Sequence, residues 1–270
     1  MLRRGIQRLT LLPPLRDAWR RGNVVMIHIG RCGSTVLGDL LGQHPRMAWD
    51  SEIFQHVFRQ KENEDHSLPP IADVDPVRYT VDRSNKVFSP YYGLEVKFFH
   101  LRALGSELGP FLDGLEAALG KMHYIVLQRE NTLRMVLSTL AARHTGVWHL
   151  RRDKERKPDR FHVDIEAVFV NRENARLLEL LREFSRDFAA TETLLRERHT
   201  LQLTYERDIQ GDPLEAYRKV CRFLDLPAPA VSVNFYRTNA VPLQDMVENF
   251  DEIRACLAGT EFEWMLDSAE

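Results

Sequence analysis

The chain has 270 residues, 44% of them hydrophobic, and a formal net charge of −2 at pH 7. This length accommodates one α/β domain with a sizeable core, and the balanced charge gives no reason to expect nucleic-acid binding. Three cysteines lie far apart, with neither the spacing of metal ligands nor a disulfide framework. We therefore expect no bound metal and a reducing compartment, the cytoplasm.

Residues 1–22, MLRRGIQRLTLLPPLRDAWRRG, form a basic arm ahead of a domain over residues 23–270. The arm lacks the apolar core of a secretory signal, and Pro13 and Pro14 interrupt any long helix. Two interpretations stay open. We favour an arm packed on the domain with solvated arginines. The alternative is a weak peripheral contact with anionic membranes.

Residues 24–43 predict a buried strand over 24–29, a tight turn, and a helix over 34–43. The turn consists of Gly30, Arg31, Cys32, Gly33, Ser34 and Thr35. Small residues leading into a helix N-terminus indicate an anion site, because backbone N–H groups and the helix dipole favour negative charge. Arg31 adds a positive charge, and two hydroxyls add donors that can also cap the helix.

Residues 44–93 show no clear hydrophobic period, and we expect loops and short helices that bind an acceptor. Glu52 lies in this stretch. A strand predicted over 94–99 carries Lys97 near its end, and His100 follows it.

A second strand-to-helix unit follows a helix predicted over 106–119. The strand covers 123–128, Arg129 ends it, and Asn131 is placed to cap a helix over 132–144 that contains Ser138. A guanidinium grips phosphate in a bidentate way, and a serine hydroxyl supplies a further donor. The pair predicts a second phosphate contact.

The rest of the chain continues the alternation of strands and helices. Helices are predicted over 164–197, 212–225 and 243–258, and a strand over 200–205. Alternating strands and helices indicate an α/β fold: a single P-loop-like three-layer domain with a central parallel sheet and helices on both faces. Ligands of such sheets bind at the carboxyl ends of the strands, where both proposed phosphate motifs lie.

The G-R-C-G-S-T turn and the Arg129–Ser138 pair resemble the PAPS-dependent sulfotransferases, which carry a shortened P-loop for 3′-phosphoadenosine-5′-phosphosulfate (PAPS). In that family an arginine at a strand end and a serine in the next helix bind the donor's 3′-phosphate. The spacing of nine residues resembles the bacterial carbohydrate and glycolipid enzymes. The resemblance covers about residues 24–265, including a Tyr-Glu run at Tyr205 that we read as architectural. Only the first two motifs are specific.

The resemblance implies a PAPS co-substrate and an acceptor that carries a hydroxyl group, on a carbohydrate or glycolipid. The implied donor-binding residues are Gly30, Arg31, Cys32, Gly33, Ser34, Thr35, Arg129, Ser138 and Arg237, the last in a late basic loop. Lys97 would neutralise a sulfuryl oxygen or line the acceptor site.

Two residues compete for the role of base. Glu52 matches the position of the catalytic glutamate in bacterial sulfotransferases that act on trehalose-type sugars. His100 is the rival, although the family's K-x-H spacing is K-x-x-H here, which on a continuing strand turns the two side chains to opposite faces.

Two other classes stay open. A P-loop nucleotide kinase or NTPase is disfavoured because no lysine precedes Ser34, and because Gln128 and Arg129 stand where a magnesium-binding acid is expected. A non-catalytic domain that binds a nucleotide or a sulfated glycan would keep the anion site without turnover.

Overall fold

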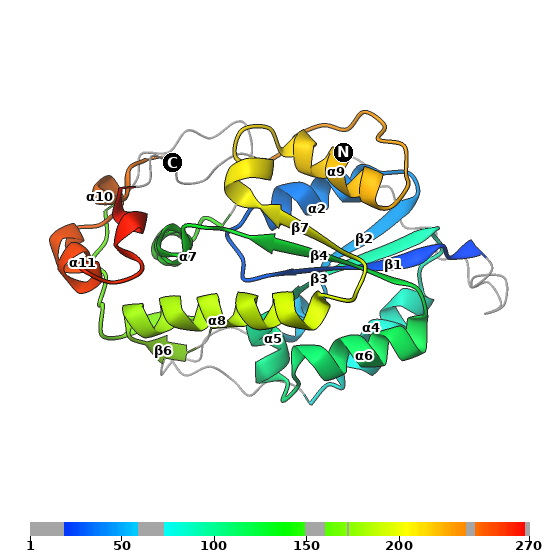
Figure 1. Cartoon of the computed structure of the whole chain (residues 1–270), viewed down its shortest axis with the longest axis horizontal. Coiled ribbons are helices and arrows are strands. Elements are labelled where there is room, and N and C mark those ends of the chain that lie inside the picture. Colours follow the sequence, from blue (N-terminus) through cyan, green and yellow to red (C-terminus); the bar gives the residue numbers. More distant parts are fainter. Residues whose placement is uncertain (1–18, 59–72, 149–159, 172, 236–240, 268–270) are drawn as a thin grey trace.

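The computed structural model of the chain describes residues 19–58, 73–148, 160–171, 173–235 and 241–267. At its centre lies a five-stranded sheet with the strand order β2-β3-β1-β4-β7 (Figure 1). These strands are β1 (Gly22–His28), β2 (Met47–Glu52), β3 (Tyr91–Lys97), β4 (Met122–Gln128) and β7 (Thr200–Thr204). Every pairing among them is parallel, which confirms the predicted α/β sheet.

Helices cover both faces of the sheet (Figure 1). On one face lie α2 (Ser34–Gln43) and α9 (Pro213–Phe223), and on the other lie α4 (Pro76–Asn85), α5 (Phe98–Ala103), α6 (Leu108–Leu119) and α8 (Leu177–Leu195). Alternate residues of β1 enter different cores: Val24 and Met26 join the α2 side, whereas Val25 and Ile27 join the other. Each face of the central strand is therefore buried, as in three-layer folds.

The connections of β1 and β4 leave in opposite directions. From β1 the chain passes through α2 to the edge strand β2, whereas from β4 it passes through α7 (Thr132–Thr145) towards β7 on the other side. Neighbouring strands whose connections diverge mark the point where open α/β sheets bind ligands. Asn131 caps α7 as expected, since its side chain accepts a hydrogen bond from Arg134 N at 2.8 Å.

The prediction of one long helix over 164–197 is wrong for the first part of that range. Its place is taken by the antiparallel strands β5 (Val168–Val170) and β6 (Glu173–Ala175), and α8 begins only at Leu177. Val168 and Val170 are buried on alternate positions, which is the period of a strand, and Asn171 turns the chain with a φ of 58°. The apolar residues of both segments imitate one helical face.

Other predicted bounds are corrected in the same way. Residues 44–93 contain the strand β2 beside the short helices α3 (Gln55–Phe58) and α4. The strand expected over 200–205 ends at Thr204, where a π-helix, η1 (Tyr205–Ile209), begins.

The helix expected over 243–258 is broken into α10 (Leu243–Met246) and α11 (Phe250–Leu257). Between them, Val247 is extended and forms a β-bridge with Phe161. A continuous helix would not leave the backbone of Val247 free for this bridge. A 3-10 turn, η2 (Glu263–Leu266), follows.

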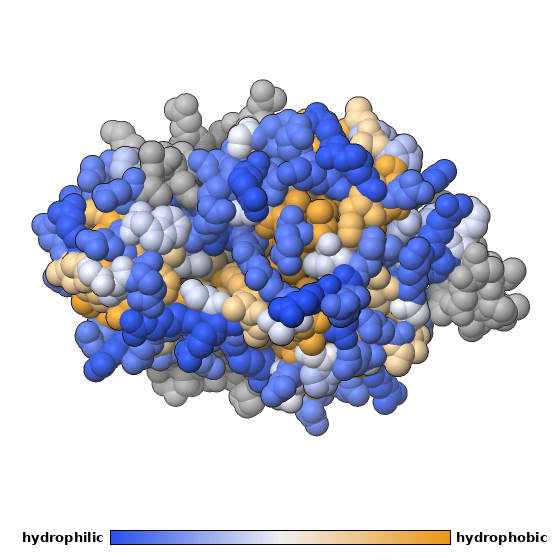
Figure 2. Space-filling view, in the orientation of Figure 1, coloured by the Kyte–Doolittle hydropathy of each residue, from blue (hydrophilic) through white to orange (hydrophobic). Residues whose placement is uncertain are grey.

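The face of the molecule seen in Figure 2 is mostly hydrophilic. Figure 2 shows charged and polar side chains over most of the face seen in Figure 1, with apolar atoms visible in patches between them. Arg102 of α5, for example, pairs with Glu183 and Asp187 of α8. Among the described helices, none has the length and apolar character needed to cross a bilayer.

Candidate functional site

The turn between β1 and α2, residues 30–35, forms what we call the anion loop. Gly30, Arg31 and Gly33 have positive φ angles of 105°, 52° and 85°. Backbone turns of this kind form concavities lined by N–H groups. Gly33 is the N-cap of α2, so the expected cap by Ser34 or Thr35 is not formed: both already lie in the first helical turn. Within the described chain, the start of α2 has no side-chain cap and no acid, and its N–H groups remain available to an anion.

The π-helix η1 packs directly against the anion loop. A Cβ atom on Gly33 would lie 2.8 Å from Cγ2 of Ile209 and 3.1 Å from Cδ2 of Tyr205. Glycine is therefore required at position 33 both for its backbone angle and for this close approach. The loop is shaped by an element about 170 residues further along the chain.

The anion loop, Arg129 and Ser138 meet in space. Arg129 donates from Nη1 to the carbonyl oxygen of Arg31 at 3.0 Å, and Arg31 donates from Nε to Oγ of Ser138 at 3.0 Å. Arg31 also donates from Nη1 to the backbone carbonyl of Trp148 at 2.7 Å. The structure thus brings together residues from the ends of β1 and β4 and from the middle of α7.

This corner concentrates positive charge. Arg129 is buried and its guanidinium lies 4.4 Å above the ring of Tyr205, with the Glu206 carboxylate 4.0 Å away. Burial and the charge of Arg129 lower the pKa of Arg31 to about 10. Two neighbouring guanidinium groups beside a helix N-terminus favour an anion with more than one negative oxygen. Glu206 itself accepts hydrogen bonds from the backbone N–H groups of Glu130 and Asn131, in line with its architectural reading.

Glu52 reaches the same edge of the sheet through a β-bulge. Trp49 pairs with Gly93, but Glu52 rather than Ser51 pairs with Glu95, so β2 contains one extra residue, and Ser51 has a φ of 52°. Because side chains alternate along a strand, the extra residue turns Glu52 to the face that it would otherwise avoid. There its Oε1 forms an ion pair with Nζ of Lys97 at 2.7 Å.

The Glu52–Lys97 pair lies beside the anion loop. A Cβ atom on Gly30 would be 3.5 Å from Cε of Lys97, so the lysine stem passes over the loop. Burial alone raises the pKa of the Glu52 carboxyl, but the charges of Lys97 and His28 outweigh it and lower the pKa to about 2. The arrangement presents a carboxylate and an ammonium next to an anion site.

Comparison with known proteins fits this geometry. A model of the Stf0 sulphotransferase family matches residues 25–234. The chain belongs to this family. Membership places it among sulfotransferases and sets aside the kinase or NTPase alternative. No curated protein matches the sequence at a significant level.

One solved structure supports the fold of this Stf0 sulphotransferase, and two others resemble the chain at lower TM-scores. A sulfotransferase from Alicyclobacillus acidocaldarius is 15% identical, with a TM-score of 0.51 over 92% of this chain and 94% of that one. The sulfotransferase domain of the Synechococcus PCC 7002 olefin synthase is 14% identical, covers 93% and 87% of the two chains and has a TM-score of 0.41. A sulfotransferase from Mycobacterium avium is 13% identical, covers 88% and 75%, and has a TM-score of 0.40.

His100 occupies a different place in the Stf0 sulphotransferase from the one expected. The strand does not continue to residue 99, because β3 ends at Lys97 and α5 begins at Phe98. His100 is buried, stacked on Phe58 with ring centroids 4.6 Å apart, and its Nδ1 has no hydrogen-bond partner within the described structure. Burial and the charge of Lys97 lower its pKa to about 3. It is a neutral aromatic ring in a hydrophobic layer.

The sequence reading missed a buried polar group below the site. Glu95, in the middle of β3, accepts a hydrogen bond from Nε1 of Trp49 at 2.7 Å and lies 3.1 Å from Nε2 of His28. His28 is fully buried at the end of β1, with this acid as its partner. An acid inside the otherwise apolar strand Y-Y-G-L-E-V was the available signal.

Ligand atoms of His28, Glu52 and Glu95 lie within 4.8 Å of one another, the spacing of a metal site. The Lys97 ammonium, 2.7 Å from Glu52, neutralises that carboxylate, and we assign no metal to the cluster. Cys32 is buried and belongs to the hydrophobic core on the α2 side of the sheet. Arg237 lies outside the described residues, and so does the charged stretch 149–159.

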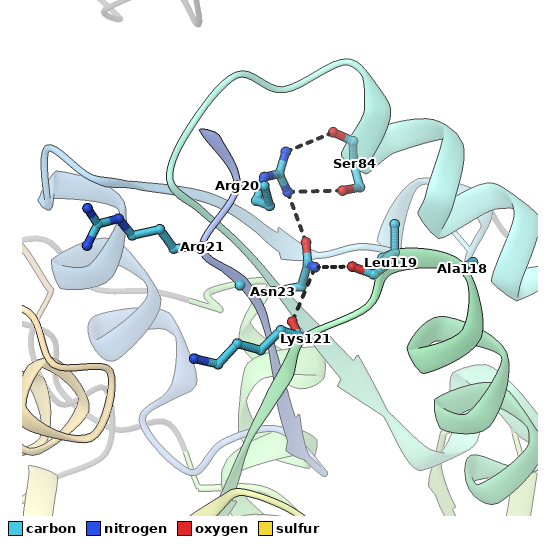
Figure 3. Close-up of a pocket in the computed structure, with 8 residues that line it drawn as sticks. Arg20, Arg21, Asn23, Ser84, Ala118, Leu119 and Lys121 are labelled. Carbon is cyan, nitrogen blue, oxygen red and sulfur yellow. Dashed lines mark hydrogen bonds between the residues drawn. The ribbon is translucent and has the colours of Figure 1, made fainter. Parts of the chain in front are cut away.

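A cavity of about 350 Å³ lies away from the candidate site, around the amino-terminal end of the central strand β1. Figure 3 shows Arg20 donating to Asn23 and Ser84, and the Asn23 amide donating to the carbonyls of Leu119 and Lys121. These hydrogen bonds connect the start of β1 to α4 and α6. The last residues of the basic arm, from Trp19, therefore pack on the domain, whereas residues 1–18 lie outside the described part.

Proposed function

We propose that this chain transfers a sulfuryl group from PAPS to a hydroxyl group of an acceptor. The observation that carries the proposal is the convergence of the anion loop, Arg129 and Ser138 at one corner of the sheet. Sulfuryl transfer from PAPS needs two phosphate contacts, one for the 5′-phosphosulfate and one for the 3′-phosphate. A corner with two guanidinium groups, a free helix start and a serine hydroxyl has the chemistry for both.

The donor contacts divide between the two motifs. The anion loop and the start of α2 would bind the 5′-phosphosulfate through backbone N–H groups, with the hydroxyls of Ser34 and Thr35 as further donors. Arg129 and Ser138 would bind the 3′-phosphate, and Arg237 would add a third cation. Arg31, which is bonded to Ser138, would stabilise negative charge between them.

Glu52 is the proposed base. The acceptor oxygen attacks sulfur as its proton passes to the Glu52 carboxylate. The sulfur–oxygen bond to the 5′-phosphate breaks, and its electron pair leaves with adenosine 3′,5′-bisphosphate. Lys97 neutralises a sulfuryl oxygen as charge develops. His100 is the weaker candidate because it is buried and stacked among aromatic rings.

The ion pair also explains how a carboxylate with a low pKa can act as the base. While Lys97 and Glu52 are paired, the carboxylate binds a proton poorly. When Lys97 moves to a sulfuryl oxygen, Glu52 loses its nearest cation and its proton affinity rises. The base is thus strengthened only when the donor is in place.

We infer a carbohydrate or glycolipid as acceptor. Support comes from the spacing of nine between Arg129 and Ser138, and from Trp148, a residue that is 45% exposed and whose carbonyl accepts a hydrogen bond from Arg31. An exposed indole beside the donor site offers an apolar face together with an N–H donor, which suits a sugar ring.

Calorimetry with adenosine 3′,5′-bisphosphate and AMP tests the donor assignment. Arg129→Ala should weaken the bisphosphate by about 10- to 150-fold, the equivalent of a charged hydrogen-bonded contact, and AMP much less. Arg254→Ala is the control, because that guanidinium also lies over a ring, 5.1 Å from Phe250, but on α11. Equal loss for both ligands would contradict the assignment of Arg129 to the 3′-phosphate.

Transfer of radiolabelled sulfate from PAPS to a panel of acceptors tests the reaction itself. Sugars, glycolipids, simple alcohols and tyrosine peptides separate the acceptor classes. Bisphosphate binding without transfer to any of them would favour the non-catalytic alternative.

A further inference from the structure

Four titratable side chains share one face of the sheet below the anion loop. His28 ends β1 and is paired in register with Lys97 of β3, while Glu95, two residues earlier, is paired with Glu52 of β2. Residues two apart on a strand lie on the same face, and paired residues on neighbouring strands do too. The four therefore form one layer, on the side that α2 covers.

Glu95 is the centre of this layer. Only 3% of it is exposed, and its two carboxylate oxygens have different partners: Oε1 accepts the Trp49 indole N–H at 2.7 Å, and Oε2 lies 3.1 Å from His28 Nε2. His28 is fully buried. A buried carboxylate that has only one neutral hydrogen-bond donor favours the protonated, charged form of a neighbouring imidazole.

Two glycines make room for this group. A Cβ atom on Gly38 of α2 would lie 2.5 Å from Oε1 of Glu95, and one on Gly93 would lie 2.2 Å from the Trp49 ring. The helix and the strand both lack a side chain where the buried carboxylate and the indole sit. Stability alone does not account for such a group, because apolar replacement of a buried ion pair is often neutral or stabilising.

His28 lies between the two halves of the transfer site. It ends the strand that leads into the anion loop, and a ligand atom of its ring is within 4.8 Å of a carboxylate oxygen of Glu52. Its buried Nδ1 has no hydrogen-bond partner within the described structure. The remaining titratable groups around this layer are Lys97, which is paired with Glu52, and His100 of α5, which carries no charge near neutral pH.

We propose that His28 is a positioning residue: as an imidazolium held by Glu95 at the end of β1, it fixes the start of the anion loop and orients the Glu52–Lys97 pair. It adds a buried positive charge under the loop without touching the donor. The role rests on the proposed function, since it concerns the same donor site. The pKa of His28 supports it: burial lowers the value, but Cys32 and Glu95 raise it to about 9.

His28→Gln is the first test, because glutamine keeps a donor for Glu95 and removes the charge. Calorimetry with adenosine 3′,5′-bisphosphate from pH 6 to pH 10 is the readout. In the natural chain, affinity should fall on the order of tenfold as the pH rises through about 9. In the variant, affinity should already be lower by that factor at pH 7, without this fall.

The other charged groups of the layer, Lys97 among them, remain in the variant and serve as an internal control. A fall near pH 9 that persists in His28→Gln would belong to another group and would overturn the proposal. His44→Gln is the matched control: His44 is also buried, at the other end of α2, with its ring bonded to the Pro227 carbonyl. It should change thermal stability but not the pH dependence of binding.

A second variant, Glu95→Gln, and NMR of the natural protein test the proposal even if His28→Gln does not fold. In the ligand-free natural protein, the His28 ring should titrate near pH 9, and Glu95→Gln should move that titration to lower pH. The pH at which bisphosphate affinity falls should move with it. A His28 ring that stays neutral at pH 7, or an affinity profile that ignores Glu95→Gln, would overturn the positioning role. Failure of the natural protein to bind bisphosphate at any pH would instead contradict the proposed function, and the NMR titration would still report on the pair.

Discussion

Alanine at position 33 should damage the anion loop twice over. The residue has a φ of 85°, in the left-handed region that L side chains rarely adopt. Its Cβ would also meet Ile209 at 2.8 and 3.0 Å and Tyr205 at 3.1 Å, all inside normal contact distance. Neither neighbour can move freely, because η1 is packed between the loop and α9.

The two effects can be given separate magnitudes. Placing alanine in the left-handed region costs about 1 kcal/mol. Forcing a methyl group into a packed contact costs roughly 1–3 kcal/mol more. For a chain of this size each kcal/mol lowers the melting temperature by about 2–4 °C, so Gly33→Ala should lower it by roughly 5–15 °C.

Gly105→Ala isolates the backbone effect. Gly105 has a φ of 67°, and nothing among the described atoms lies within 4 Å of the position of its Cβ. The Gly105→Ala substitution should lower the melting temperature by about 2–4 °C and leave binding of adenosine 3′,5′-bisphosphate unchanged. Scanning calorimetry and titration calorimetry on both variants make the comparison. If Gly33→Ala has the same melting temperature as Gly105→Ala and binds the bisphosphate normally, η1 does not shape the loop.

Four further outcomes are expected. Glu52→Gln should lower kcat by roughly 10²–10⁴-fold with little change in bisphosphate affinity, measured by radiolabelled transfer. His100→Phe should preserve kcat and its pH profile, because that ring is neutral and stacked among aromatics. The stability that His28 contributes should be complete below about pH 6.5, its unfolded pKa, and disappear as the pH rises through about 9, so the melting curves of the natural chain and His28→Gln should converge above that pH. Deleting residues 1–18 should abolish any salt-sensitive sedimentation with anionic liposomes while leaving transfer to a soluble acceptor intact; unchanged sedimentation would end the membrane interpretation of the arm.

Local patterns were enough to predict the parts of the candidate site that lie within one strand-to-helix unit. The anion loop is contiguous in sequence, and Arg129 and Ser138 are separated by less than three turns of helix. Such features depend on backbone geometry that glycine, capping residues and hydrophobic period report directly.

The layer below the loop could not be predicted in this way. The contacts of Glu95 with Trp49 and His28 depend on the order β2-β3-β1 and on the register between those strands. The position of Glu52 depends on a one-residue bulge in an edge strand whose polar half resembles a loop. Pairing register across three strands is a property of the folded sheet, and a single sequence carries only weak traces of it.

Two hydrogen bonds of the Arg31 side chain have a consequence for the kinetics of donor binding. Its guanidinium joins the middle of α7 to the backbone that follows that helix, through Ser138 and the Trp148 carbonyl. A donor that takes over this guanidinium must wait until the bond to Trp148 opens. Association then contains a first-order step, and in stopped-flow mixing the observed rate should level off as donor concentration increases, instead of climbing towards the diffusion limit.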